Sequence, residues 1–148
     1  MVTPRIKEIH SYADLGGVAL RTLDAQECAE AGLTAEAGIN RSIRDSYASY
    51  AIYDGDEVVV VWGYMPGAFG GRVVRIWMLT TPAVQDVWFW FARTSVRFRD
   101  YFLERYPVIE AYVWRGHLPA CRWLHWLGFE ECEADPAHPD FMFMRKGR

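Results

Sequence analysis

Cys121 and His125 stand four residues apart, a spacing that places both side chains on one face of a helix. Together with His117 and Cys132 they supply ligand types that zinc prefers. The spacing of the four matches no compact zinc finger or knuckle, and Cys121 falls on the apolar side of the expected helix. We therefore favour a buried structural cysteine and expect no metal. A Cys–His nucleophile pair is less favoured still, because no third residue that would orient the imidazole can be assigned.

A run of four aromatic residues, Trp-Phe-Trp-Phe over 88–91, is the most unusual pattern in the chain. Successive residues of a helix point in different directions, so these four side chains cannot all face one core. Trp123 and Trp126 raise the same question on a later segment. We expect a partly exposed aromatic patch that anchors a partner, with Trp88, Trp90 and Trp126 as candidate contacts. Core packing is the alternative for each of these residues taken singly.

Arginines recur at positions 93, 97 and 105, a series that suggests a phosphate-binding or nucleic-acid face. Asp100 and Glu104 interleave with them, and the net charge of the chain is −3 with a pI of about 5.8. An ordinary solvated helix face is therefore the favoured interpretation, and we expect no nucleic-acid partner.

Length and composition predict one globular domain over residues 1–148. The hydrophobic share of 51% and the charged share of 24% argue against disorder and against a fibrous repeat. The longest apolar runs, such as Val58–Trp62, are far shorter than the roughly 18 residues of a membrane span. No signal peptide is visible, and three cysteines without framework spacing favour a reducing, cytoplasmic setting.

The elements that must position these side chains follow from periodicity and from turn residues. We expect, in order, a strand over Thr3–His10, weak helices over Tyr12–Leu20 and Asp24–Ala31, a helix from Thr34 to about Tyr47, and strands over Tyr50–Tyr53, Val58–Tyr64 and Arg72–Thr80. The last three strands should form an antiparallel meander. A loop is expected over 66–71.

The second half predicts a long helix over Pro82–Tyr106 that Pro107 stops. A strand over Val108–Trp114, a helix from Pro119 to Gly128, and strands over Phe129–Glu133 and Phe141–Arg145 follow. This order predicts an α/β (α+β) layered fold, with a central sheet covered by helices on both faces.

The order of elements resembles the GNAT fold of the acetyl-CoA-dependent N-acetyltransferases across nearly the whole chain. The most specific stretch is Gly116–Phe129, in which Ala120, Gly128 and Phe129 keep the family's spacing when counted from His117. A small residue there lets the helix approach the sheet, and Gly128 ends the helix. The resemblance implies a mixed sheet of about six to seven strands.

A narrower resemblance points to the small GNAT-like proteins of tailed bacteriophages, including internal virion proteins of short-tailed phages. It is carried by Ile76–Thr81, Phe102–Pro107, Tyr112–Trp114 and Arg122–Phe129. It implies a protein of the virion or of the host cytoplasm. Its partners would be other phage or host proteins, or further copies of the chain.

The cofactor motif of the family, Gln/Arg-x-x-Gly-x-Gly/Ala, is altered in this sequence. Gln85 can open the motif, but the two glycine places fall on Trp88 and Trp90. The glycines would let backbone N–H groups approach the pyrophosphate of acetyl-CoA. The resemblance leaves Leu79, Thr80 and Gln85 as candidate cofactor-binding residues.

The family's catalytic groups are altered as well. Leu124 stands where a tyrosine would protonate the leaving thiolate, and His117 stands in place of an asparagine. In this frame Glu110, His10 and the strand end Thr80–Thr81 would border an acceptor cleft, where Glu110, or less favourably His10, is the candidate general base. The alternative is a solvated carboxylate and ordinary surface polar groups. Arg93 or Arg97 would be within reach of a coenzyme A phosphate.

Two functions of different classes remain. The first is a phage-type protein that keeps the fold, has weakened or lost acetyltransferase chemistry and binds a partner through aromatic side chains. The alternative is an active acyl-CoA-dependent N-acetyltransferase with an atypical cofactor loop.

Overall fold

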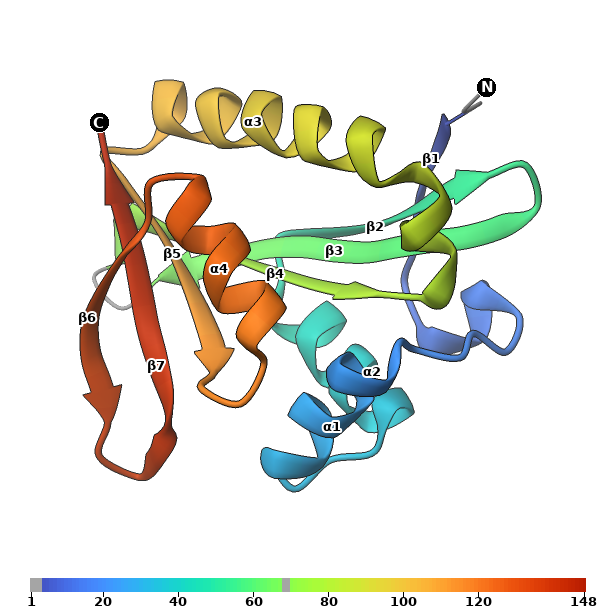
Figure 1. Cartoon of the computed structure of the whole chain (residues 1–148), viewed down its shortest axis with the longest axis horizontal. Helices are drawn as coiled ribbons and strands as arrows, with labels where there is room; N and C mark the ends of the chain where they lie inside the picture. The colour runs from blue at the N-terminus through green and yellow to red at the C-terminus, as the bar shows by residue number, and fades with distance from the viewer. Residues whose placement is uncertain (1–3, 68–69) are drawn as a thin grey trace.

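The computed structural model describes residues 4–67 and 70–148 and contains a seven-stranded mixed sheet (Figure 1). The strands are β1 (Pro4–Glu8), β2 (Ala48–Asp54), β3 (Glu57–Gly67), β4 (Gly70–Thr80), β5 (Val108–Trp114), β6 (Glu130–Asp135) and β7 (His138–Gly147). Their order is β1-β2-β3-β4-β5-β7-β6, and only β4 and β5 run parallel to each other.

Four α-helices cover the two faces of the sheet: α1 (Thr22–Glu30), α2 (Ala35–Asp45), α3 (Trp88–Arg105) and α4 (Leu118–Trp126). Two 3₁₀ segments, η1 (Tyr12–Leu15) and η2 (Pro82–Val87), lead into α1 and α3. Helices α1 and α2 pack on one face of the sheet and α3 and α4 on the other (Figure 1). The predicted order of elements and the layered fold are confirmed.

Strand alternation divides the apolar side chains between two cores. On the α3–α4 face, Val60 and Trp62 of β3 pack with Phe91 and Leu124 of the helices. On the α1–α2 face, the neighbouring Val61 joins a second core with residues that include Ile39 of α2. The β-branched residues at the start of β3 suit this position, because they fit a strand that is buried on both faces.

Two predicted helices differ from the structure. The helix expected over Tyr12–Leu20 is only the 3₁₀ turn η1, because Gly16 and Gly17 follow it with positive φ angles. The single helix expected over Pro82–Tyr106 is divided into η2 and α3. Thr81 caps η2 through its side chain, and the chain leaves helical geometry at Val87 (φ −126°, ψ 23°) before α3 begins.

The antiparallel meander of β2, β3 and β4 is confirmed. Strands β3 and β4 reach further than expected, to Gly67 and from Gly70, so they occupy part of the predicted loop. The centre of that loop, residues 68–69, and the start of the first predicted strand, residue 3, lie outside the described residues. No helix among residues 4–67 and 70–148 has the length and apolarity required to cross a membrane.

Gly63 is needed where β3 passes beneath Trp77. A Cβ atom at Gly63 would lie 2.6 Å from Trp77 Nε1 and 2.8 Å from the carbonyl oxygen of Ala48. The indole cannot withdraw without loss, because its N–H donates to Ser46 Oγ at 2.8 Å.

Gly63→Ala should therefore destabilise the fold by about 1–3 kcal/mol, the usual cost of overpacking. Urea denaturation measures this loss. Gly71→Ala is the matched control, because a Cβ atom there would meet nothing within 4 Å. Equal free energies of unfolding for the two variants would contradict the assigned packing.

Candidate functional site

The sheet opens between β4 and β5. The two strands pair only from Val73 opposite Val108 to Arg75 opposite Glu110, and their later residues diverge (Figure 1). A cleft of about 540 Å³ lies at this opening. Its lining includes Trp77 from the α1–α2 face of the sheet and Met78 from the α3–α4 face. The cleft therefore reaches both faces of the sheet.

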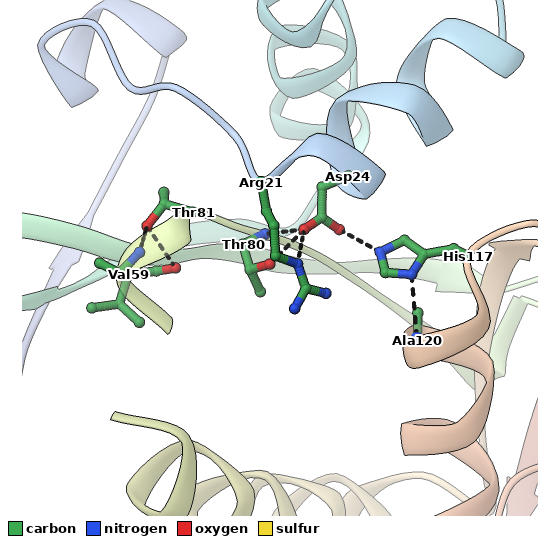
Figure 2. Close-up of polar contacts among 8 residues, drawn as sticks. Arg21, Asp24, Val59, Thr80, Thr81, His117 and Ala120 are labelled. Atoms are coloured by element: carbon green, nitrogen blue, oxygen red, sulfur yellow. Dashed lines mark hydrogen bonds and ion pairs between the residues drawn. The ribbon is translucent and has the colours of Figure 1, made fainter. Parts of the chain in front are cut away.

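A buried polar network joins α1 to the end of β4 and the start of α4 (Figure 2). Asp24 lies at its centre: one carboxylate oxygen is 2.9 Å from His117 Nε2, and the other accepts from the hydroxyl and the backbone N–H of Thr80. Arg21 Nε lies 3.4 Å from this second oxygen. Asp24 and His117 are both almost fully buried. The network therefore holds three segments together across the end of the split.

The contacts of His117 determine its tautomer. The backbone N–H of Ala120 donates to Nδ1 at 3.2 Å, so Nδ1 carries a lone pair and caps α4. The proton must then sit on Nε2, which donates it to Asp24. Both ring nitrogens are occupied, and His117 links α1 to α4.

Glu27 is a second acidic residue of α1, one turn after Asp24, and it lines the cleft. Its Oε2 accepts from the backbone N–H of Trp114 at 3.0 Å, at the end of β5. Burial raises the pKa of Glu27 to about 7, although the Trp114 hydrogen bond opposes the shift. Glu27 therefore exchanges a proton near neutral pH, inside the opening between the strands.

Glu110, the predicted general base, is fully buried and forms the last β4–β5 pair with Arg75. Its Oε1 accepts from Arg75 Nε at 2.9 Å, and its Oε2 from Arg145 Nε at 3.2 Å. Glu110 therefore holds two guanidinium groups in place on the α1–α2 face. Its role as a base stays a prediction, and Glu27 is the cleft carboxyl group with a pKa near neutrality.

The candidate cofactor-binding residues lie in different surroundings. Leu79 is buried and lines the cleft, whereas the hydroxyl of Thr80 is bonded to Asp24, and Gln85 is exposed on η2. Thr81 donates to the carbonyl oxygen of Val58 at 2.6 Å, which fastens the end of β4 (Figure 2 shows its contacts with the neighbouring Val59). The exposed His10 lies on the loop after β1.

Aromatic side chains occupy the start of α3, where the resemblance placed the glycines. Trp88 is 42% exposed and Phe89 84% exposed, whereas Trp90 is half-buried against the α3–α4 core. Phe91 contacts Trp88, with 5.5 Å between ring centroids, and stacks on Trp123 of α4 at the same distance. We call Trp88, Phe89, Phe91 and Trp123 the aromatic cluster.

The residues of the chain fit one part of acetyl-CoA and not another. After Arg75, β4 has no strand partner on its β5 side in the described part of the chain, and the apolar cleft beside it suits a narrow pantetheine arm. The start of α3 does not offer the glycines that the resemblance expects for a pyrophosphate, because Trp88 and Trp90 stand at those positions and residues 72–115 contain no glycine. Leu124 is buried in the core and supplies no acidic hydrogen.

The remaining predicted residues are placed as follows. Trp126 is 60% exposed on α4, as an interface residue must be, and its partner role stays a prediction. Cys121 is buried, as predicted, and Cys132 is exposed. Within the described part of the chain, no group of three or more His, Cys, Asp or Glu side chains could hold a metal ion.

Comparison of this architecture with solved structures identifies its fold. The chain is similar to an acetyltransferase from Thermus thermophilus (TM-score 0.69, 12% identity, covering 99% of this chain and 98% of that one). It is also similar to the spermidine N-acetyltransferase from Vibrio cholerae in complex with CoA and spermine (TM-score 0.67, 16% identity, 97% and 95%). A third similar structure is the N-acetyltransferase PseH of Campylobacter jejuni in complex with acetyl coenzyme A (TM-score 0.59, 8% identity, 99% and 99%).

The chain has the GNAT acetyltransferase fold. The likeness lies in structure, since identity is at most 16% among these three. No family model and no curated protein matches the sequence. The GNAT fold that the resemblance implied is therefore confirmed.

Sequence reasoning missed Asp24 and Glu27. Their spacing of three residues on a short helix is the one signal that could have found them, because it places two carboxyl groups on one face. Their partners His117 and Trp114 lie 93 and 87 residues later in the chain, and no local pattern brings these groups together.

The raised pKa of Glu27 predicts a pH dependence of stability. The unfolded chain loses this proton near pH 4.5 and the folded chain near pH 7, so the free energy of unfolding should fall as pH rises between these values. Glu27→Gln keeps an acceptor for the Trp114 N–H and has no proton to lose in this range. Its free energy of unfolding should therefore fall less with rising pH than that of the native chain, by up to about 3 kcal/mol. Urea denaturation at pH 4.5 and pH 8 measures it, and equal pH slopes for both proteins would contradict the assignment.

Proposed function

We propose that this GNAT-fold chain is a partner-binding protein of the phage type, virion-associated or acting in the host cytoplasm, in which acetyl-CoA-dependent transfer is weakened or lost. The observation that carries the proposal is the aromatic cluster at the start of α3. Its Trp88 stands where the resemblance expects a glycine of the pyrophosphate cradle, and Trp88 and Phe89 expose large apolar side chains to solvent.

The aromatic cluster supports loss of the cofactor cradle in a direct way. A phosphate is held at a helix start by backbone N–H groups that it can approach closely. Trp88 and Trp90 place indole rings next to that backbone, and the Phe91–Trp123 stack ties α3 to α4 beside the cleft. The acid that would protonate the departing thiolate is also replaced, by Leu124.

The same cluster supports binding to another protein. Aromatic side chains anchor protein interfaces because they bury a large area and lose little conformational entropy. Trp88 and Phe89 offer such an area, because both side chains are exposed next to each other at the start of α3. The partner is thus a protein surface with a complementary apolar hollow.

A second function, N-acyl transfer from an acyl-CoA, is favoured by a different observation. The β4–β5 cleft is open, and Glu27 supplies a carboxyl group inside it with a pKa of about 7. Such a group accepts a proton near neutral pH, as a general base must. The two functions therefore differ in one measurable property, the affinity for acetyl-CoA.

Acetyl-CoA titration tests the proposed function. If the cofactor cradle is lost, about 1 mM acetyl-CoA should not raise the melting temperature of the protein. An intact site with micromolar affinity would instead add about 4 kcal/mol to the free energy of unfolding at this concentration. Isothermal calorimetry provides a second readout. A micromolar dissociation constant would overturn the loss of cofactor binding and favour the acyltransferase.

Paired substitutions test whether the cluster is surface or core. Trp88→Ala combined with Phe89→Ala should change the free energy of unfolding little, because both rings are exposed. Phe91→Ala, the matched control two residues later, should cost about 3–5 kcal/mol since its ring is buried against Trp123. A comparable loss in the double variant would show that the two exposed rings support the core and would end the interface hypothesis.

A further inference from the structure

The sheet has two open edges, formed by β1 and β6. Neither strand has a partner on its outer side among the described residues. All five residues of β1 are exposed, and so are the first residues of β6. Unpaired backbone groups along an exposed edge can accept another strand.

The two edges carry opposite charges. Strand β1 has the sequence Pro-Arg-Ile-Lys-Glu, with the cations Arg5 and Lys7. Strand β6 begins with Glu130 and Glu131, and its sequence contains no cation. Glu131 forms an ion pair with Arg115 at 2.7 Å. Glu130, the first residue of β6, forms no ion pair with another described residue.

The strand register shows which sheet face each charge occupies, because residues directly opposite each other share a face. Lys7 lies opposite Ala51, and Ala51 lies opposite Val61. Val61 in turn lies opposite Leu79 of β4. These residues other than Lys7 belong to the core beneath α1 and α2, so Lys7 lies on the α1–α2 face.

The other half of the sheet continues the same face. Arg75 precedes Leu79 by four residues, an even number, so the two share a face of β4. Arg75 lies opposite Glu110, and Glu110 lies opposite Arg145. Arg145 lies opposite Glu130. Glu130 at one edge and Lys7 at the other therefore lie on the same face of the sheet.

The directions of the edge strands also match. Five of the six strand pairings are antiparallel and one is parallel, so β1 and β6 run in opposite directions. When a second copy continues the sheet in the same orientation, its β6 meets β1 as an antiparallel strand. The basic residues of β1 and the acidic residue Glu130 then lie on one face, where cross-strand pairs of opposite charge are stabilising.

We propose that the chain binds a second copy of itself by edge-to-edge pairing, with β6 of one copy added antiparallel to β1 of the next. The contact joins two different surfaces, so a pair of copies still has one free β1 edge and one free β6 edge. Further copies can add to these edges, which leads to open chains or closed rings rather than to a two-fold dimer. The proposal does not rest on the aromatic cluster or on the state of the cofactor site.

The edge charges also select against other pairings. Two β1 edges would place Lys7 and Arg5 near the same residues of the other copy, and two β6 edges would bring carboxylates together. Pro4 cannot donate a hydrogen bond, which limits the length of any pairing at β1. Charges and proline at an edge commonly prevent indiscriminate association, and here they favour the one complementary edge.

Sedimentation velocity over a concentration series tests the proposal. We expect the mean mass of the native chain to grow beyond that of a dimer as concentration rises at low salt. Because the attraction is between exposed charges, 1 M salt should reduce the association. A chain that stays monomeric at every concentration overturns the proposal, and so does a closed dimer that does not grow.

Charge-reversal variants assign the contact to the two edges. Lys7→Glu and Glu130→Lys should each weaken association by about fivefold or more, because each places like charges across the pair. The double variant restores opposite charges and should recover the association. Arg93→Glu, an equal change of charge on the exposed surface of α3, is the control and should have no effect.

Circular dichroism of each variant establishes that it is folded, which exposed positions on an edge should permit. Association that survives both single reversals overturns the assignment to β1 and β6. If each single variant loses association and the double variant does not regain it, the proposed pairing of the two edges is wrong. Reversal of both charges should leave the attraction between the edges intact.

Discussion

The parting of β4 and β5 is the constraint on which the rest of the site depends. Three residue pairs join the strands, and Glu110 fixes the last of these positions through its contacts with Arg75 and Arg145. Beyond these three pairs, both strands have backbone groups without a strand partner on their facing sides among residues 4–67 and 70–148. The chain satisfies one of them with the carboxylate of Glu27 and bridges the far end of the opening through Asp24 and His117.

The bridge explains why His117 and Asp24 are buried together. A buried carboxylate is stable only when its oxygens are bonded, and Asp24 meets this requirement with Thr80, His117 and the nearby Arg21. His117 also caps α4, so the position of that helix depends on α1. Asp24 therefore couples the two helical layers around the cleft, whereas the resemblance implied an asparagine at position 117.

The aromatic content of the chain has two different uses in this structure. Trp62, Phe91 and Phe102 fill the α3–α4 core, as large side chains do in a small domain. Trp88 and Phe89 are instead exposed at the start of α3, and Trp88 takes one of the two positions at which the resemblance expects glycine. Burial in the core explains why Trp62, Phe91 and Phe102 are aromatic. It does not explain Trp88 and Phe89, and the proposed partner binding is therefore based on these two residues.

The sequence alone determined the order of elements and the meander of β2 to β4, because these depend on local periodicity. The GNAT fold was implied by the resemblance that the order of elements and residues 116–129 carry. The sequence also determined that Cys121 is buried, since its helix face is apolar. The division of residues 82–106 into η2 and α3 was missed, because the backbone change at Val87 carries no proline or glycine signal. Only the tertiary structure decided the site. Asp24, Glu27 and Glu110 have their roles through partners on distant segments, and burial of a carboxyl group is set by the packing of whole layers, which no local pattern contains.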